Sequence, residues 1–207
     1  MHTDQDGNSF HTVKIGNQTW MAENLRVTKY RDGTEIPKLF GAEEWQNTSS
    51  GAYCKYSNNV DTYGNLYNWY AINDSRNIAP EGWHVPTDAE WKELEMHLGM
   101  TKSEADGDGM RGSNEGSKLA GNAALWTDGK LGNNAEFGTS DFSVLPGGYR
   151  YSNNGSYEGM RDNGYFWTSS VLSSYNSWYR KLDYASSGVY RDYYGKRYGF
   201  SVRCVKD

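Results

Sequence analysis

Aromatic and leucine side chains recur at helical spacing shortly after residue 60. Tyr63, Leu66, Tyr67 and Tyr70 stand at positions i, i+3, i+4 and i+7. Because one side of a helix repeats every 3.6 residues, this spacing places the four side chains on one face. The pattern predicts a helix over residues 63–72.

The most complete helix signal lies between Pro86 and Gly99. Thr87 with Glu90 three residues later has the sequence of a capping box, and Gly99 is typical of the residue that follows a helix end. We therefore predict a helix from Thr87 to about Leu98. The face that it turns to the protein is marked by Trp91, Leu94, Glu95 and Leu98.

Alternating apolar and polar residues predict strands towards both ends of the chain. A strand–turn–strand pattern over residues 10–30 has its turn at Gly16-Asn17. Further strands are predicted over residues 165–170, 177–184, 188–193 and 197–205. Alternation and apolar character place these residues in the core: Trp167, Trp178, Leu182, Val189 and Cys204. In the last strand, Arg203 lies on the face opposite to Cys204.

Two segments, residues 31–62 and 100–140, show little periodicity and are predicted as loops. Loops as long as the second one are uncommon inside a compact domain and often have a function. The chain contains 8 Trp, 17 Tyr, 24 Gly and only 4 Pro. This composition favours a loop-rich domain that contains β-structure over a helical bundle.

The 207 residues fit one domain, predicted over residues 1–207, with residues 1–5 as a linker or an artificial extension. No apolar run is long enough to span a membrane, and the chain opens with polar residues rather than with a signal peptide. If the protein is exported, we expect its leader to have been removed from this chain.

The formal net charge of -5 argues against general binding to nucleic acid. The charge is uneven, because residues 165–207 carry seven Lys and Arg against three Asp. A basic C-terminal part favours an anionic ligand, although a solvated surface of mixed charge is the commoner interpretation.

Cys54 and Cys204 are separated by 150 residues, which is the wrong spacing for a chelating pair. In an oxidising compartment they are able to join an early and a late segment by a disulfide. The alternative, to which we give the same weight, is that both cysteines are reduced, buried thiols.

Four stretches of the chain together resemble the Fibrobacter succinogenes major paralogous domain family. These stretches are Thr12–Leu25, Tyr63–Tyr70, Gly82–Trp91 and Gly199–Val205, and the match runs in family order from about Asp6 to Asp207. The resemblance implies an α+β, C-type-lectin-like fold, with two helices, a small mixed or antiparallel sheet and long loops. It also implies export, and hence a location outside the cell or at its surface, often with a lipid anchor.

Catalysis has little support in the sequence. The four histidines include no pair at metal-ligand spacing, and no phosphate loop or nucleophile motif occurs. The segment Val85–Trp91 is also similar to the formylglycine-generating enzyme family, whose oxidase chemistry needs two neighbouring cysteines near the C-terminus. Only Cys204 lies there, so that activity is not carried over. We predict that the protein is not an enzyme.

One stretch, residues 104–115, resembles a calcium-binding EF-hand loop, with oxygen-bearing side chains at positions 1, 3, 5 and 12. Position 1 is Glu104 rather than Asp, Arg111 occupies position 8, and no convincing helix follows, so a polar turn is favoured. The tripeptides of calcium-dependent sugar-binding lectins are missing. We predict neither a metal nor a cofactor.

Residues 170–194 are rich in Tyr, Ser and Asn, as are paratopes, in which Tyr gives large contact area at low entropy cost. Some members of the resembled family are similar to the variable proteins of diversity-generating retroelements, whose binding faces have this composition. The predicted ligand-binding residues are Tyr175, Asn176, Arg180, Tyr184, Tyr190, Arg191, Asp192, Tyr193 and Tyr194. Alternatively, half of these tyrosines face the core.

Together these observations predict a non-catalytic domain that recognises a protein or a glycan on another cell or surface through its C-terminal face. The alternative is a structural or interaction module of a surface assembly. A cleft with stacked tyrosines and polar partners favours a glycan, whereas a flat and dry aromatic face favours a protein.

Overall fold

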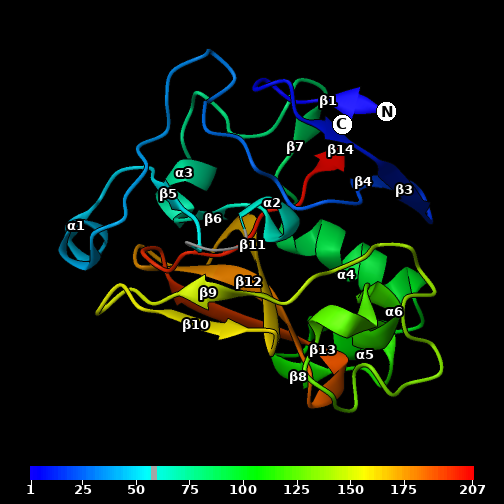
Figure 1. The fold of residues 1–207 in the computed structure, drawn as a ribbon. Coiled ribbons are helices and arrows are strands. Elements are labelled where there is room, and N and C mark those ends of the chain that lie inside the picture. The colour runs from blue at the N-terminus through cyan, green and yellow to red at the C-terminus, as the bar shows by residue number, and fades with distance from the viewer. Residues whose placement is uncertain (57–59) are drawn as a thin grey trace.

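The largest sheet of the protein has six strands in the order β10-β9-β11-β12-β13-β8 (Figure 1). The computed structural model describes residues 1–56 and 60–207. The strands of this sheet are β8 (Gly109–Arg111), β9 (Gly147–Arg150), β10 (Tyr157–Met160), β11 (Asn163–Val171), β12 (Asn176–Asp183) and β13 (Ser186–Gly195). All neighbours are antiparallel except β9 and β11. The strands predicted over 165–170, 177–184 and 188–193 are therefore confirmed.

A second sheet joins the two ends of the chain in the order β3-β4-β14-β7. Its strands are β3 (Thr12–Ile15), β4 (Gln18–Met21), β14 (Val205–Lys206) and β7 (Trp83–His84). Gly16 adopts a positive φ of 60° in the turn between β3 and β4, as predicted for that hairpin. Two short pairs complete the strands: β1 (His2–Thr3) with β2 (Ser9–Phe10), and β5 (Tyr53–Cys54) with β6 (Leu66–Tyr67).

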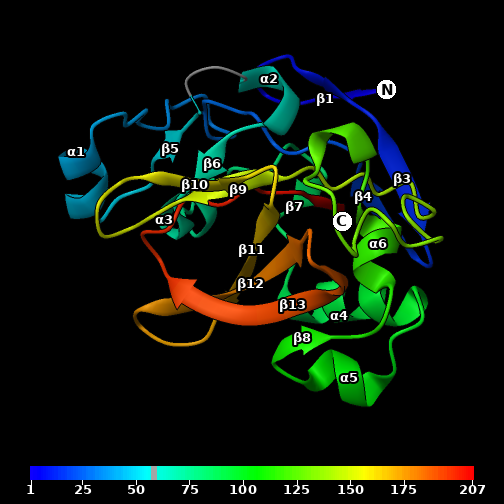
Figure 2. The ribbon, with the colours of Figure 1, turned by 60° about the horizontal axis from the view of Figure 1, so that its bottom comes forward.

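Helices are short, and α4 (Asp88–His97) is the longest in the described residues. The others are α1 (Ala42–Asn47), α2 (Val60–Tyr63), α3 (Trp69–Ile72), α5 (Lys102–Asp106), α6 (Glu115–Leu119) and the 3-10 helix η1 (Ala123–Leu125). In both views of the ribbon, α5 lies beside β8, and α4 and α6 lie in the same part of the molecule (Figures 1 and 2). None of the helices in the described residues has the length and apolar character needed to cross a membrane.

The helix predicted at Thr87 is confirmed, together with its capping box. The Thr87 hydroxyl accepts a hydrogen bond from the Glu90 amide, and the Glu90 carboxylate accepts one from the Thr87 amide. Gly99 follows the helix with a φ of +125°, a conformation that glycine adopts without steric cost.

The single helix predicted over residues 63–72 is wrong. Gly64, with a φ of +74°, ends α2, and β6 follows before Asn68 caps α3 by accepting from the Ala71 amide. The backbone N–H and C=O of Tyr67 pair with Phe200 rather than with helical neighbours. The apolar spacing thus reflects burial of several short elements, since Tyr63, Leu66 and Tyr67 are all at most 6% exposed.

Residues 100–140 were expected to form one long loop, but they contain α5, β8, α6 and η1. These elements have three to five residues, which is too short to produce a visible period in the sequence. Thr101 and Glu104 form a second capping box at the start of α5. The α+β class is therefore confirmed, whereas the expected number of two helices is too low.

The continuous strand predicted over residues 197–205 is also wrong. Single bridges join Gly199 to Arg150, Phe200 to Tyr67 and Ser201 to Phe166, before β14 begins at Val205. Each residue in this segment meets a different part of the chain, so no ladder forms. Cys204 is fully buried as predicted, and Arg203 on the other side is fully buried too.

Each face of β11 and β12 contributes side chains to an apolar core cluster. Trp167, Leu182 and Val189 are fully buried, as alternation predicted. The prediction for Trp178 is wrong, because its ring is only half-buried and the Arg191 guanidinium stacks over it at 3.7 Å from the ring centroid. A charged neighbour, rather than apolar packing, covers this tryptophan.

Cys54 and Cys204 are both buried free thiols. They belong to different apolar clusters, Cys54 beside Trp45 and Leu66, and Cys204 in the cluster that contains Trp167. Burial raises the pKa of the Cys54 thiol to about 11, which keeps it protonated and unreactive at neutral pH. The sequence left a disulfide and two reduced, buried thiols as alternatives, and the structure contains the two buried thiols.

A reducing agent is therefore expected to leave the melting temperature unchanged. A disulfide between residues this far apart would contribute about 4 to 5 kcal/mol by chain entropy, so its reduction would lower Tm by many degrees. Differential scanning calorimetry with and without dithiothreitol measures this directly. A clear drop in Tm on reduction would contradict the free-thiol state.

Candidate ligand-binding surface

One face of β12 and β13 packs against α4 through a buried network of charged side chains. Arg180 is fully buried, its Nε donates to Glu95 Oε1 at 2.6 Å and its Nη1 donates to Asp88 Oδ1 at 2.8 Å. Arg191 is 6% exposed and donates from Nε to the same Asp88 oxygen at 2.8 Å. These contacts hold the strands on the helix.

The prediction that Arg180 and Arg191 belong to a ligand-binding surface must be corrected. They are opposite each other in the register of β12 and β13, and they point to the α4 side of the sheet. The carboxylates of Asp88 and Glu95 compensate their charges there. Neither guanidinium is available to a ligand in this arrangement.

The other face of the same strands carries a cluster rich in tyrosine. Cross-strand pairing places Lys181 opposite Tyr190, and Tyr179 opposite Asp192, with their side chains on this face. Side chains from β9, β11 and the C-terminal segment adjoin them. We call this surface the tyrosine face, made of Tyr149, Tyr165, Tyr179, Lys181, Tyr190, Asp192, Tyr194 and Tyr198.

Three rings of the tyrosine face stack in a row. The Tyr179 and Tyr194 centroids are 5.1 Å apart with planes 5° from parallel, and those of Tyr194 and Tyr198 are 4.4 Å apart at 8°. Tyr151 meets Tyr198 edge-on at 5.3 Å. The ring faces cover one another, and the exposed part of the row is provided by Tyr194, at 38% exposed, and by the half-buried Tyr198.

Two hydroxyl groups of this row, those of Tyr179 and Tyr194, have no hydrogen-bond partner among the described residues, whereas the Tyr198 hydroxyl interacts with the side chains of Tyr151 and Ser152. The Tyr165 hydroxyl likewise has no partner within the described part of the chain. Tyr165 and Tyr179 are buried, at 7% and 4% exposed, whereas Tyr194 is 38% exposed. Burial raises the pKa of Tyr165 and Tyr179 well above the ordinary value, so both remain neutral donors at physiological pH.

Charged groups stand among the rings. Lys181 Nζ lies 3.9 Å from the centroid of the Tyr190 ring and 3.0 Å from Asp183 Oδ2. Glu158 accepts a hydrogen bond from the Tyr149 hydroxyl at 2.8 Å. The face therefore combines apolar edges with donors and acceptors of both charges.

The nine predicted site residues do not form one site. Tyr190, Asp192 and Tyr194 come together on the tyrosine face, whereas Tyr193, on the same strand, points to the α4 side and meets Trp178 edge-on. Tyr175 is 80% exposed in the turn between β11 and β12, next to Asn176 at the start of β12.

Tyr184 lies at the opposite end of the sheet from that turn. Its ring packs against the apolar cluster that contains Leu131, and its backbone carbonyl accepts from the Leu131 amide. It is therefore separated from the other predicted residues.

Five members of the tyrosine face were missed in the sequence. Tyr179 and Lys181 are the sequence neighbours of Arg180 on β12, and neighbours on a strand point to opposite faces. This alternation could have placed both side chains on the face opposite to Arg180. Tyr149, Tyr165 and Tyr198 come from other segments. No local pattern indicates that they join β12 and β13.

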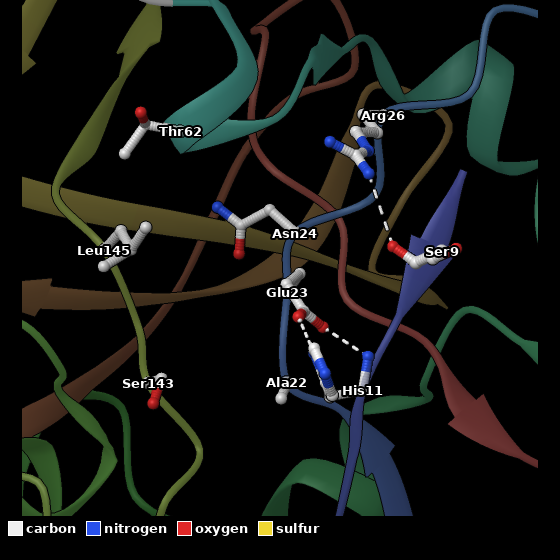
Figure 3. A pocket seen from close by; sticks show the side chains of 9 residues that line it. All are labelled: Ser9, His11, Ala22, Glu23, Asn24, Arg26, Thr62, Ser143 and Leu145. Atoms are coloured by element: carbon white, nitrogen blue, oxygen red, sulfur yellow. Dashed lines mark hydrogen bonds and ion pairs between the residues drawn. The ribbon is translucent and has the colours of Figure 1, made fainter. Parts of the chain in front are cut away.

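A cleft of about 570 Å³ lies elsewhere, between β2, the segment 22–26, α2 and residues 143–145 (Figure 3). Its lining residues are Ser9, His11, Ala22, Glu23, Asn24, Arg26, Thr62, Ser143 and Leu145. Figure 3 shows Glu23 turned towards His11, with 2.7 Å between Oε1 and Nδ1. Arg26 Nη2 donates to the Ser9 carbonyl at 3.3 Å.

This cleft does not assemble a nucleophile with a base. Among the described residues, no hydroxyl group hydrogen-bonds the His11 ring, which pairs with the Glu23 carboxylate. The Asn24 amide is held by the Tyr63 carbonyl and by the buried Arg203 guanidinium. The polar groups of the cleft thus largely satisfy one another, and no sequence motif pointed to them.

The segment that resembles an EF-hand loop directs its carboxylates to different partners. Glu104 caps α5 through Thr101, Asp106 pairs with Lys92 and Lys102, and Asp108 pairs with Arg191. No group of three or more His, Cys, Asp or Glu side chains in the described residues is placed to hold a metal ion.

Comparison with known proteins identifies the chain at the level of a family. The family model of the Fibrobacter succinogenes major domain matches residues 13–206. No curated protein and no solved structure matches the chain.

Proposed function

We propose, from the premise that this chain belongs to the Fibrobacter succinogenes major domain family, that it is a non-catalytic recognition domain that binds a glycan on its tyrosine face. The observation that carries the proposal is the row of stacked rings, in which the hydroxyl groups of Tyr179 and Tyr194 have no hydrogen-bond partner among the described residues. Tyrosine offers contact area and a polar handle at the same point.

Glycan recognition suits this surface better than a dry protein contact does. Sugar rings present hydroxyl groups beside apolar C–H groups, and the tyrosine face presents hydroxyl groups beside ring edges. Lys181 and Asp192 stand among the rings and add a charged donor and a charged acceptor. A core of a protein interface is instead depleted in charged residues.

The proposal includes a location outside the cell or at its surface, with a lipid anchor, and a C-type-lectin-like arrangement of the fold. The lectin-like arrangement is supported by the pairing of β14 with β4, which brings the two ends of the matched region into one sheet, and by the packing of α4 on the six-stranded sheet. A narrower form of the same proposal is that this chain is the variable protein of a diversity-generating retroelement.

Replacing Tyr194 by alanine is expected to weaken glycan binding roughly tenfold or more, since truncation of a central aromatic contact commonly costs 1.4 kcal/mol or above. Tyr193→Ala is the matched control, because Tyr193 is adjacent, similarly exposed at 44% against 38%, and on the opposite face. Tyr194→Phe removes only the hydroxyl group and preserves the stack.

Binding is measured on a glycan array and a panel of surface proteins, followed by titration of the hits, with melting curves for each variant. Loss in Tyr194→Ala with retention in Tyr193→Ala supports the proposal. Equal loss in both variants, or hits confined to proteins, would overturn it.

A further inference from the structure

A groove of about 370 Å³ opens where the β11–β12 turn, the end of β13 and the β9–β10 turn meet. Its lining residues are Tyr70, Ser152, Asn153, Ser174, Tyr175, Gly195, Lys196 and Arg197. Two of these side chains are cationic, two are aromatic, and none is acidic. This differs from the tyrosine face, where carboxylates and one ammonium group are mixed.

The groove is continuous with the tyrosine face. The Tyr198 hydroxyl interacts with the side chains of Tyr151 and Ser152, and Ser152 forms part of the groove wall. Asn153, also in the wall, donates from Nδ2 to the Tyr151 hydroxyl at 3.4 Å. An extended ligand on the stacked rings is therefore able to continue into the groove.

Backbone contacts hold the Lys196 ammonium group in place. Lys196 Nζ donates to the carbonyls of Ser173 at 3.1 Å and Ser174 at 3.0 Å, and it lies 4.6 Å from the centroid of the Trp69 ring. An ammonium group has three N–H donors, so one remains for a ligand. No carboxylate in the described residues forms an ion pair with Lys196.

Arg197 adds a second positive charge with most of its donors unused. Its Nε donates to the Thr48 carbonyl at 3.2 Å, and no described residue hydrogen-bonds its two terminal nitrogens. The protein as a whole carries a net charge of -5, yet this groove concentrates uncompensated positive charge. A planar guanidinium with two free nitrogens matches the paired oxygens of a carboxylate or sulfate group.

We infer that the groove binds an acidic group, a carboxylate or a sulfate, of a glycan whose neighbouring sugars lie on the tyrosine face. The inference rests on the proposed function and narrows its ligand class. A neutral sugar would gain little from two cations beside each other. An acidic sugar combines a charge for Lys196 and Arg197 with a ring that reaches Tyr175 and Tyr70.

The test compares matched polysaccharides that differ in charge. Binding of polygalacturonate is titrated beside that of its fully methyl-esterified form, and binding of chondroitin sulfate beside that of unsulfated chondroitin. We expect one acidic member to bind at least about fivefold more tightly than its less charged counterpart at low salt, with a preference that declines as salt is added. The first pair identifies a carboxylate ligand and the second a sulfate ligand.

Arg197→Gln, at an exposed position that should not affect folding, is expected to abolish this preference and leave binding of the less charged form unchanged. Arg197→Lys is expected to restore part of it. The control is Lys130→Gln, which removes the same charge at another exposed position. Melting curves verify that each variant is folded.

The outcomes separate this inference from the proposed function. If glycans bind through Tyr194 but acidic and neutral forms bind equally, or if Lys130→Gln lowers the preference as much as Arg197→Gln does, the groove assignment is wrong and the proposed function stands. If no glycan binds at all, both fail.

Discussion

Replacing Glu95 by alanine is expected to lower the free energy of unfolding by about 3 to 5 kcal/mol. Glu95 is fully buried and accepts hydrogen bonds from Nη1 and Nη2 of Arg111, each at 2.9 Å, and from Nε of Arg180 at 2.6 Å. Its removal leaves two buried guanidinium groups short of a compensating charge. Because a domain of ordinary stability unfolds at a cost of about 5 to 15 kcal/mol, this is a large share of the total.

Urea denaturation followed by circular dichroism measures the change. Glu93→Ala is the matched control, since Glu93 lies on the exposed side of the same helix and its loss is expected to cost about 0.5 kcal/mol or less. Glu95→Gln retains the shape but not the charge, and it should also be destabilising. A Glu95→Ala variant as stable as Glu93→Ala would show that the ion network is not needed for folding.

Raising the pH above about 10 is expected to unfold the protein within one to two pH units. Burial raises the pKa of five tyrosines that are less than a tenth exposed. The pKa of Tyr30 rises to about 12. The pKa values of the other four also lie above the ordinary value of 10; these residues are Tyr53, Tyr67, Tyr165 and Tyr179. Above pH 10 the unfolded chain releases these protons while the folded chain retains them. Stability is therefore fully present below pH 10 and is lost as the pH rises.

The size of this effect follows from the number of groups. Each such tyrosine lowers the free energy of unfolding by up to ~1.4 kcal/mol per pH unit between its unfolded and its folded pKa, so the five together lower it by at most ~7 kcal/mol per pH unit. Burial of Arg203 acts in the opposite direction, because it lowers the pKa of that guanidinium to about 9 and favours the folded state as the pH rises above 9. One opposing group does not offset five tyrosines, and the buried thiol of Cys54 adds to the loss.

Thermal melts at pH 8, 9, 10 and 11, together with the ultraviolet absorbance of tyrosinate, measure the transition. The buried tyrosines should ionise in one cooperative step that coincides with the loss of tertiary structure. Gradual ionisation of all tyrosines in a chain that remains folded would contradict the burial of these side chains.

Local signals in the sequence were sufficient for elements whose stabilising contacts are local. The capping box of Thr87 and Glu90 begins α4, and the alternation over residues 188–193 indicated a strand on which Tyr190 and Asp192 share a face. In both cases the determining interactions connect residues a few positions apart. A single sequence contains them completely.

The site was only partly predictable for the opposite reason. Arg180 and Arg191 stood in a Tyr- and Ser-rich stretch and looked exposed, but their partners Asp88 and Glu95 lie on a helix about ninety residues earlier. Composition does not indicate that a charged side chain will find a buried partner. Only the docking of α4 on the sheet decides that these two side chains stabilise the fold.

By itself, the sequence determined the family, the α+β class, the capped helix and the strands whose alternation places tyrosines on one face. The tertiary structure decided which face is open, that Tyr149, Tyr165 and Tyr198 join it, and that the segment 63–72 divides into three elements. The physical reason is that periodicity reports only how a residue lies on its own element. Which segment covers that element depends on contacts between parts of the chain that are distant in sequence.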